Sequence, residues 1–276
     1  MKGRVLIVAG SDSGGGAGIQ ADIKTVTALG GYAMTAITAL TAQNTQGVFG
    51  IHEVPPDFIA RQLTVVLSDL GADCVKIGML HRPEVIDAVV AVLVAPQPEG
   101  AQGIPIVVDP VMVAKGGARL LTEDSVVRLA RHLLPRATVL TPNIPEAEAL
   151  TGLAIRTPDD VMAAGRALLG LGAAAALVKG GHLKGDVVTD VLFTKAGVES
   201  FASPRIPTTS THGTGCTLAS AIATGLAQGL ELRAAVVRAR AYVQEALRTA
   251  PAFGRGHGPL NHGHTVTPFN ASKSAR

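Results

Sequence analysis

The sequence predicts an α/β fold in which a mostly parallel central sheet carries helices on both faces. Apolar runs of strand length alternate with stretches of helix length along the 276 residues. Hydrophobic residues make up 47% of the chain and aromatic residues only 3%, so Ala, Val, Leu and Ile must fill the core. Such aliphatic richness suits buried parallel strands. The length allows one large core, and we expect a single domain over residues 1–262.

The first half of the chain contains three predicted strands, each followed by a helix. Glycines separate the first strand from its helix, and Pro83 falls in the first turn of the third helix, where a missing N–H is tolerated. We expect strands at Arg4–Ala9, Met34–Leu40 and Cys74–Met79, and helices at Gly18–Leu29, Asp57–Leu70 and Pro83–Val94.

The second half continues the alternation and ends on two helices. Pro96–Gly103 is expected to be a loop too short to link domains, and residues 263–276 a polar, disordered tail. Thr122 is the expected N-cap of the helix that follows it. We expect strands at Ile104–Asp109, Thr138–Pro142, Ala176–Gly180 and Thr189–Thr194, and helices at Thr122–Leu134, Thr217–Gln228 and Leu232–Thr249.

Composition excludes several classes of protein. The net charge is +3, from 24 basic and 21 acidic residues, and no basic block or aromatic ladder points to nucleic acid. The two cysteines show neither metal-type spacing nor a disulfide framework. The apolar run of the first ten residues is too short for a signal peptide, and no window approaches the roughly 18 apolar residues of a membrane span. We therefore expect a cytoplasmic protein without a membrane partner.

Candidate functional residues follow the strands, where open parallel sheets collect ligands. The first strand leads into "GSDSGGGAGIQAD", whose glycines permit close approach of a ligand and whose Asp22 lies on the first helical turn. The spacing fails the dinucleotide pattern G-x-G-x-x-G. Asp22 is thus either a ligand-binding acid or a charge that favours the helix N-terminus.

Polar and flexible side chains follow the next two strands. Gln43 offers a donor and an acceptor, as the edge of an aminopyrimidine or a vitamin ring requires; the alternative is a turn with solvated amides. Met79 ends the third strand, where its thioether can pad a flat ring or simply fill the core.

Charged residues follow three later strands. Asp109 ends an apolar strand, where an unused buried acid is costly. Asn143 and Glu146 follow another strand, and Lys179 ends a further one. Carboxylates at neighbouring strand ends suit Mg²⁺, although Glu146 could instead be a helix-start charge. No Walker A motif is present, because "GK" never occurs.

The stretch "THGTGCTLASAIA" places Gly213, Gly215 and Cys216 where a helix begins. Unpaired N–H groups and the helix dipole make such a start an anion site. The alternative is a tight turn with Cys216 as a small buried hydrophobe. Together with the acids and lysines, this turn predicts phosphate chemistry without a P-loop.

These motifs together resemble the hydroxymethylpyrimidine/phosphomethylpyrimidine kinases of thiamine biosynthesis, in the ribokinase-like superfamily. The resemblance runs from about Arg4 to His262 through "GSDSGGGAGIQADIKT", "TALTAQNTQGV", "KIGML", "VVDPVMVAKGG", "LTPNIPEAEAL", "VKGGH" and "THGTGCTLASAIA". It implies a three-layer sandwich and an enzyme that uses ATP and Mg²⁺ to phosphorylate the pyrimidine alcohol and then its monophosphate. It also implies a homodimer.

The resemblance also assigns roles to residues. It implies that the pyrimidine contacts Gly10, Ala17, Asp22, Gln43, Met79 and Val111. It places Asn143, Glu146 and Lys179 at the nucleotide, with Asp109 and Glu146 at the metal and Gly213 and Gly215 in the anion hole. Related sugar kinases carry an aspartate base where this family has a cysteine, so we expect Cys216, with a pKa lowered by the helix N-terminus and nearby cations, to act as the base or near it. The first loop reads "SDSGGGAG" where the family usually has "SDPSGGAG", which loosens it without changing its length.

Three rival functions stay open at this stage. A pyridoxal kinase would phosphorylate a similar hydroxymethyl group on a vitamin B6 ring, although Gln43 beside Met79 favours the aminopyrimidine. A nucleotide-binding oxidoreductase is suggested only by the first glycine loop, and its spacing fails. The third rival is a non-catalytic binding protein. Such a protein would have no need for acids, lysines and an anion hole together.

Overall fold

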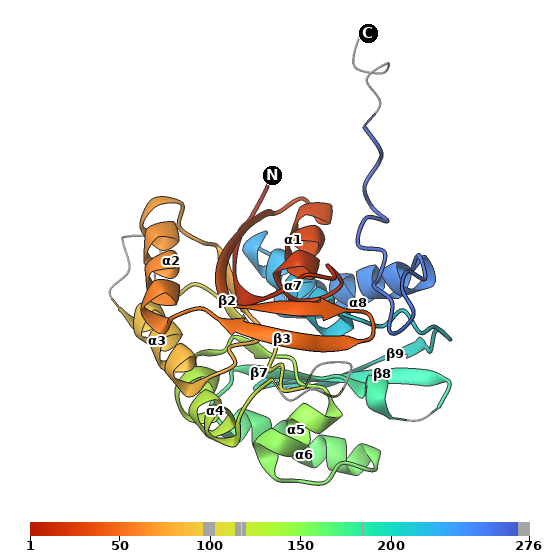
Figure 1. Ribbon diagram of the computed structural model, residues 1–276. Helices are drawn as coiled ribbons and strands as arrows, with labels where there is room; N and C mark the ends of the chain where they lie inside the picture. The colour runs from red at the N-terminus through yellow and green to blue at the C-terminus, as the bar shows by residue number, and fades with distance from the viewer. Residues whose placement is uncertain (96–102, 114–116, 118–119, 184, 270–276) are drawn as a thin grey trace.

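A nine-stranded sheet in the order β3-β2-β1-β4-β5-β6-β7-β8-β9 runs through the computed structural model (Figure 1). The structure describes residues 1–95, 103–113, 117, 120–183 and 185–269. The strands from β2 to β7 pair in parallel, while β3 and the β8–β9 ribbon pair antiparallel at the two ends. The strands are β1 Arg4–Asp12, β2 Tyr32–Asn44, β3 Gly47–Glu53, β4 Cys74–Ile77, β5 Ile106–Val108, β6 Val139–Leu140, β7 Ala175–Val178, β8 Val187–Thr194 and β9 Gly197–Pro204.

Helices cover both faces of this sheet (Figure 1). One layer holds α1 Gly18–Ala28, α7 Thr214–Ala227 and α8 Leu232–Arg248. The other holds α2 Pro56–Asp69, α3 Pro83–Val94, α4 Glu123–Arg128, the π-helical turn η1 Leu129–Leu133, α5 Ile144–Thr151 and α6 Pro158–Gly170. Two short 3₁₀ turns, η2 Leu134–Arg136 and η3 Gly180–His182, complete the helical elements of the described residues.

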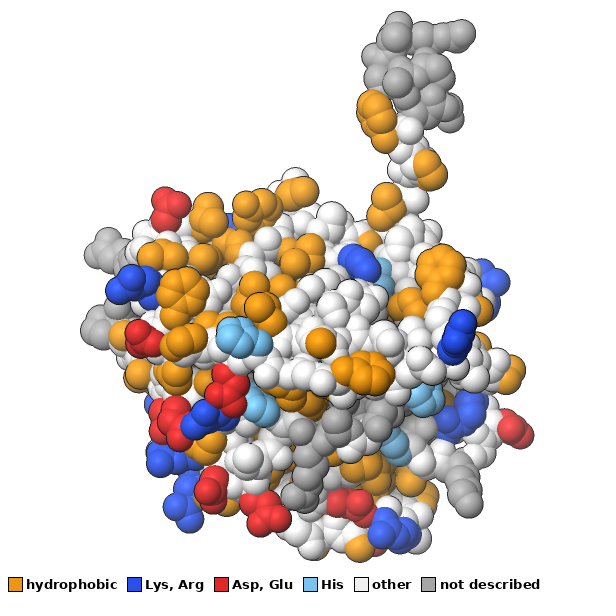
Figure 2. Space-filling model, in the orientation of Figure 1, with side chains coloured by type: hydrophobic (Ala, Val, Ile, Leu, Met, Phe, Trp, Pro, Cys, Tyr) orange, Lys and Arg blue, Asp and Glu red, His pale blue; other side chains and the backbone are white. Residues whose placement is uncertain are grey.

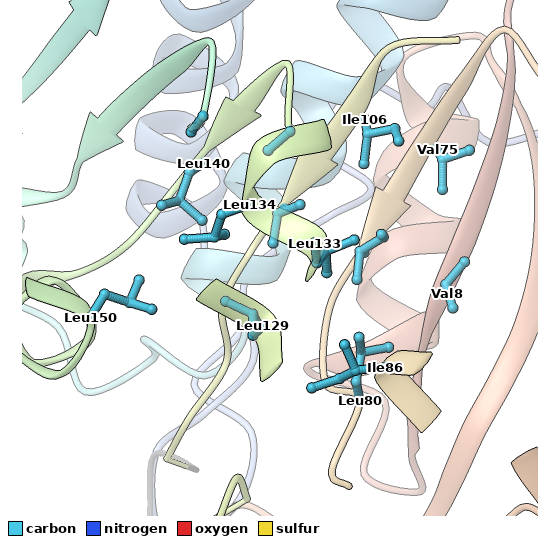
Figure 3. Packing of buried hydrophobic residues seen from close by; sticks show 14 of the residues in the cluster. Val8, Val75, Leu80, Ile86, Ile106, Leu129, Leu133, Leu134, Leu140 and Leu150 are labelled. Carbon is cyan, nitrogen blue, oxygen red and sulfur yellow. The ribbon is translucent and has the colours of Figure 1, made fainter. Parts of the chain in front are cut away.

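The alternation of side chains along the strands fills the two interfaces between layers. In β1, Leu6 and Val8 pack on the α2–α6 side, whereas Val5 and Ile7 pack on the α1–α7–α8 side, and all four are fully buried. Figure 3 shows part of the first cluster, in which leucines of η1 and η2 meet residues of β1, β4 and α3. A three-layer α/β sandwich is therefore confirmed.

The strand order reverses beside β1, since the chain crosses from β1 to β2 on one side and then continues to β4 on the other. Open parallel sheets bind ligands at the carboxyl ends of strands near such a switch point. The two glycine-rich turns meet there, because an added side-chain carbon at Gly213 would lie 1.9 Å from the Gly16 carbonyl oxygen.

Several elements differ from the sequence expectations. The strands β3 and β9 and the helices α5 and α6 were not predicted. The expected helix Thr122–Leu134 is interrupted, passing from α4 into η1 and η2 around Pro135. The expected loop at Pro96–Gly103 falls almost wholly outside the described residues.

The C-terminal segment leaves the body of the molecule as an extended chain (Figure 1). His264 still contacts the Tyr242 carbonyl, and Thr265 donates to the carbonyl of Ala28. The packed region thus reaches slightly beyond residue 262, and residues 270–276 of the predicted tail lie outside the described residues. On the face drawn in Figure 2, acidic and basic side chains are interspersed. Among the described residues, no helix has the length and apolar character needed to cross a bilayer.

Candidate active site

A cavity of about 1150 Å³ opens at the carboxyl ends of the parallel strands. All predicted site residues except Asp22 line it, although they come from turns far apart in the chain. They are Gly10, Ala17, Gln43, Met79, Asp109, Val111, Asn143, Glu146, Lys179, Gly213, Gly215 and Cys216. The volume suits two small molecules bound side by side rather than a single small ring.

Two acids and a lysine form a buried cluster at one part of the cavity. Lys179 Nζ lies 2.8 Å from Asp109 Oδ1 and 3.8 Å from Glu146 Oε2. Burial disfavours the charge on Lys179, but the two carboxylates outweigh it and raise its pKa, so the ammonium stays charged. Burial and the charge of Asp109 raise the pKa of Glu146 to about 7, against the opposing effect of Lys179.

Asn143 and Glu146 have a structural task as well. Asn143 is the N-cap of α5, where its side chain accepts from the Glu146 N–H while Glu146 Oε2 accepts from the Asn143 N–H. The capping box therefore fixes the Glu146 carboxylate beside Lys179. Glu146 therefore has the helix-start role, and because it also lines the cavity its role at a metal stays a prediction.

The turn before α7 is held in one conformation by two glycines. Gly213 has φ +83° and contacts Gly16 so closely that no side chain fits. An added carbon at Gly215 would lie 3.0 Å from Lys179 Nζ and 3.4 Å from Asp109 Oδ2. The N–H groups of the first α7 turn, including Gly215 and Cys216, lack intrahelical acceptors. A helix N-terminus thus faces the acid–lysine cluster across the cavity.

The environment of Cys216 contradicts the expected thiolate. The side chain is half-buried and lines the cavity. Desolvation raises the pKa of this thiol to about 12, helped by the charges of Asp22 and Asp109 and opposed by Lys76. The Lys76 ammonium does not offset the burial, so the prediction of a lowered pKa was wrong.

Asp22 is the one predicted site residue that does not line the cavity. It is fully buried between α1, β4 and α7, where Lys76 Nζ lies 2.8 and 2.9 Å from its two oxygens and Ser220 donates to it at 2.7 Å. Lys76 itself lines the cavity. The acid therefore holds a buried ammonium in place, and direct contact with a ligand is not what this geometry favours.

Gly10, Met79 and Val111 give the cavity a wall that is suited to a flat ring. An added side-chain carbon at Gly10 would lie 2.5 Å from Met79 Cε, so the thioether lies directly on the glycine backbone. Val111 packs in the same hydrophobic cluster as Met79, and Gln43 also lines the cavity.

Sequence reasoning missed Asp12, His212 and Lys76. Asp12 and His212 form a buried hydrogen-bonded pair at the cavity, with His212 Nε2 2.8 Å from Asp12 Oδ2. Asp12 ends β1 and His212 directly precedes Gly213, so both lie inside motifs already identified. Lys76 lies inside the apolar strand β4, where a charge signals a buried partner.

The predicted metal ligands are the two acids Asp109 and Glu146, and both line the cavity. No group of three or more His, Cys, Asp or Glu side chains with metal-binding geometry occurs in the described part of the chain. Asp109 and Glu146 can still serve Mg²⁺, which takes one or two carboxylates and completes its shell with water and phosphate oxygens. Lys115, which follows β5 in the sequence, lies outside the described residues.

Comparison with known proteins agrees with this geometry. The family model described as phosphomethylpyrimidine kinase matches residues 12–261. The hydroxymethylpyrimidine/phosphomethylpyrimidine kinase of Rhizobium meliloti is 47% identical over 94% of this chain and 96% of its own length. The thiamine biosynthesis bifunctional protein ThiED of Geobacter sulfurreducens is 55% identical over 95% of this chain, which spans only 52% of that protein.

The solved structures that match this chain share its fold, and they include proteins with two different named activities. A phosphomethylpyrimidine kinase of Clostridium difficile has TM-score 0.77 and 42% identity, over 89% of this chain and 99% of its own. A pyridoxal kinase of Bacillus subtilis, solved as an ADP complex, has TM-score 0.86 and 34% identity, over 95% and 98%. The match of the family model over most of the sequence, together with the relatives above, shows that this chain belongs to the phosphomethylpyrimidine kinase family.

Proposed function

We propose that this chain transfers the γ-phosphoryl group of ATP to 4-amino-5-hydroxymethyl-2-methylpyrimidine, and then to the resulting monophosphate. The observation that carries this proposal is the convergence of Gln43, Met79 and the α7 turn on one cavity in a member of this family. A ring at Gln43 would present its hydroxymethyl group toward the α7 N-terminus, while nucleotide phosphates would meet Lys179.

In the first transfer, the hydroxymethyl oxygen attacks the γ-phosphorus and the bond to the β–γ bridging oxygen breaks, releasing ADP and the hydroxyl proton. In the second, a phosphate oxygen of the monophosphate attacks in the same way. The N–H groups of Gly215 and Cys216 and the Lys179 ammonium stabilise the charge on the transferring group. Such stabilisation is the main protein contribution, because phosphoryl transfer needs little covalent help.

The proton of the hydroxyl need not leave early. In a loose transition state the attacking oxygen keeps its hydrogen until transfer is well advanced. A thiol with a pKa of about 12 is protonated at neutral pH, so Cys216 does not act as a preformed thiolate base. We propose that Cys216 lies beside the hydroxymethyl group. Its main contribution to the reaction is then the backbone N–H, which stabilises the charge on the transferring phosphoryl group.

Asp109 and Glu146 are the residues that would hold Mg²⁺. Both carboxylates lie at Lys179, and the pair fits a metal that binds few protein ligands. The ion, when bound, would neutralise charge on the nucleotide phosphates. Lys179 would then share the two acids with the metal and turn toward the phosphates.

The competing function is a pyridoxal kinase, since structures with that activity share the fold at 33–34% identity. The pyrimidine kinases match more closely in sequence, at 42–47% identity. Coupled ADP-release assays with both alcohols separate the two functions, and equal kcat/KM values would contradict our assignment.

Mass analysis of the products tests the proposed function directly. The pyrimidine alcohol incubated with ATP, Mg²⁺ and the protein should yield first a monophosphate and then a diphosphate. A Lys179→Met variant is the control for contaminating kinases and should form neither. Absence of both products with the unmodified protein would refute the proposal.

Two further expectations accompany this function. We propose a homodimer, as the family resemblance implies; light scattering that gives the mass of one chain would contradict it. A cytoplasmic location is also proposed, because the second substrate is ATP, and cell fractionation tests it.

A further inference from the structure

The chain after α8 returns to the cavity and contacts the turns around it. The His257 N–H donates to the Thr45 carbonyl at 2.8 Å, in the turn between β2 and β3. The Gly258 carbonyl accepts from the His212 N–H at 3.0 Å, in the turn before α7. Residues 257–262, which we call the C-terminal segment, therefore join two turns that belong to distant parts of the sequence.

The end of the C-terminal segment is anchored on α8. The Asn261 N–H donates to the Ala246 carbonyl at 3.0 Å, and the Tyr242 hydroxyl donates to the His262 carbonyl. Leu260 is 3% exposed and packs in the cluster between the sheet and the α1–α7–α8 layer. The His262 side chain is itself 5% exposed, so this anchoring holds a buried imidazole against α7.

His262 reaches the start of α7 through one hydroxyl. Thr217 Oγ1 lies 2.8 Å from the Gly213 carbonyl oxygen and 3.0 Å from His262 Nε2. A hydroxyl has one hydrogen and a carbonyl oxygen can only accept, so the hydrogen of Thr217 belongs to the Gly213 contact. His262 Nε2 must then donate its own hydrogen to Oγ1. Each hydrogen serves one bond, and the chain of donors runs from His262 through Thr217 to Gly213.

The protonation of His262 agrees with this chain of donors. Burial, with smaller effects from the charges of Lys24 and two other histidines, lowers the pKa of His262 to about 4. The ring is therefore neutral at neutral pH and carries a single N–H. The Thr217 contact places that N–H at Nε2.

We propose that His262 is a positioning residue that holds the anion-binding turn of α7 through Thr217. The Gly213 carbonyl begins the hydrogen-bond ladder of α7, since it also accepts from the Thr217 N–H at 2.9 Å. Glycine leaves a backbone free to adopt several conformations, and this turn contains Gly213 and Gly215. Donors stabilise a transferring phosphoryl group best when their direction is fixed beforehand. The inference rests on the proposed function, because it takes that group as the charge at α7.

Two variants of His262 test this role. His262→Met removes the N–H, whereas His262→Gln can place an NH₂ group near the position of Nε2. With the pyrimidine alcohol, ATP and Mg²⁺, His262→Met should lower kcat about tenfold, the value of one hydrogen bond. The KM for the pyrimidine should change little, because Gln43 and Met79 lie on other turns. His262→Gln should recover most of the lost kcat, and an unchanged kcat in His262→Met would overturn the proposal.

A double-mutant cycle tests whether His262 acts through Thr217. Thr217→Val removes the hydroxyl at similar shape and should lower kcat by a similar factor. Both changes break the same chain of donors, so the double variant should be no slower than either single variant. Two independent effects would instead multiply to about a hundredfold loss, and that result would contradict the proposal.

Asn261→Ala is the matched control in the same segment. Its side-chain NH₂ donates to Thr249 Oγ1 at 3.2 Å, at the end of α8 and not at the α7 turn. The change should lower the urea midpoint of unfolding while kcat of the folded protein stays at the wild-type value. A merely structural role of the segment predicts that Asn261→Ala and His262→Met lose kcat alike, and that outcome overturns the proposal.

Nitrogen NMR of the ligand-free wild type supplies a second measurement in case a variant does not fold, with His262→Gln identifying the signal. Nε2 should carry the hydrogen at neutral pH, and a hydrogen on Nδ1 instead contradicts the proposal. A protein that phosphorylates neither the alcohol nor its monophosphate would refute the function and with it the purpose of this contact. A protein that phosphorylates the pyrimidine with the hydrogen on Nδ1 would refute only the positioning role.

Discussion

Gly215→Ala separates stability from activity at the α7 N-terminus. The position is helical and its φ is outside the positive region, so alanine is allowed by the backbone. In a helix, Ala is favoured over Gly by roughly 0.5–1 kcal/mol. The new carbon, however, would lie 3.0 Å from Lys179 Nζ and 3.4 Å from Asp109 Oδ2, so the lysine must move by a few tenths of an ångström.

We therefore expect unfolding free energy within about 1 kcal/mol of wild type, because the gain in propensity and the close contact oppose each other. The methyl group also covers the N–H groups that face the phosphoryl group, and loss of one such donor lowers kcat by about 10²–10³. Urea melts and a coupled ADP-release assay measure the two quantities.

Gly170→Ala is the matched control. Gly170 ends α6, its φ is not positive, and nothing lies within 4 Å of the added carbon. It should leave kcat unchanged. If Gly215→Ala retained kcat within a factor of three of that control, the α7 amides would not be the anion site.

Three further predictions follow from buried charges. Lys76→Met leaves Asp22 without its buried partner and should lower the unfolding free energy by about 3–5 kcal/mol, measured by urea denaturation; a loss below 1 kcal/mol contradicts it. The raised pKa of Glu146, about 7, means that the folded protein binds this proton more tightly than the unfolded chain. The contribution of Glu146 to stability is present below the pKa of the unfolded chain and falls as pH rises to about 7. The unfolding free energy of wild type relative to Glu146→Gln should therefore decline between these two pKa values. Iodoacetamide should alkylate Cys216 slowly at neutral pH, with a rate that still rises throughout the mildly alkaline range in which the protein stays folded, and fully buried Cys74 is the unreactive internal reference; rapid labelling at pH 7 would show a lowered pKa.

Strands and helices with strong apolar patterns could be predicted from the sequence, and the others could not. The strand β1 contains a run of fully buried aliphatic residues. By contrast, β3 and β9 are edge strands with mostly exposed or half-buried side chains, so no apolar run marks them. Their existence depends on pairing with β2 and β8, which is a tertiary contact.

Candidate site residues that lie at the ends of strands could be predicted from the sequence. Properties that depend on which side chains the fold brings together could not. The positions of Gln43, Lys179 and Gly215 follow from the rule that ligands gather at the carboxyl edge of the sheet. The pKa of Cys216 depends on how deeply the fold encloses it, and the role of Asp22 depends on a lysine 54 residues away along the chain. Neither property is encoded in a local motif.

A crystal structure with the pyrimidine alcohol and a non-hydrolysable ATP analogue tests the central claim most directly. The account predicts the ring amine and neighbouring ring nitrogen at the Gln43 amide, with the hydroxymethyl oxygen between the γ-phosphate and the Gly215–Cys216 N–H groups. A pyrimidine bound away from Gln43, or a γ-phosphate remote from the α7 N-terminus, would contradict it.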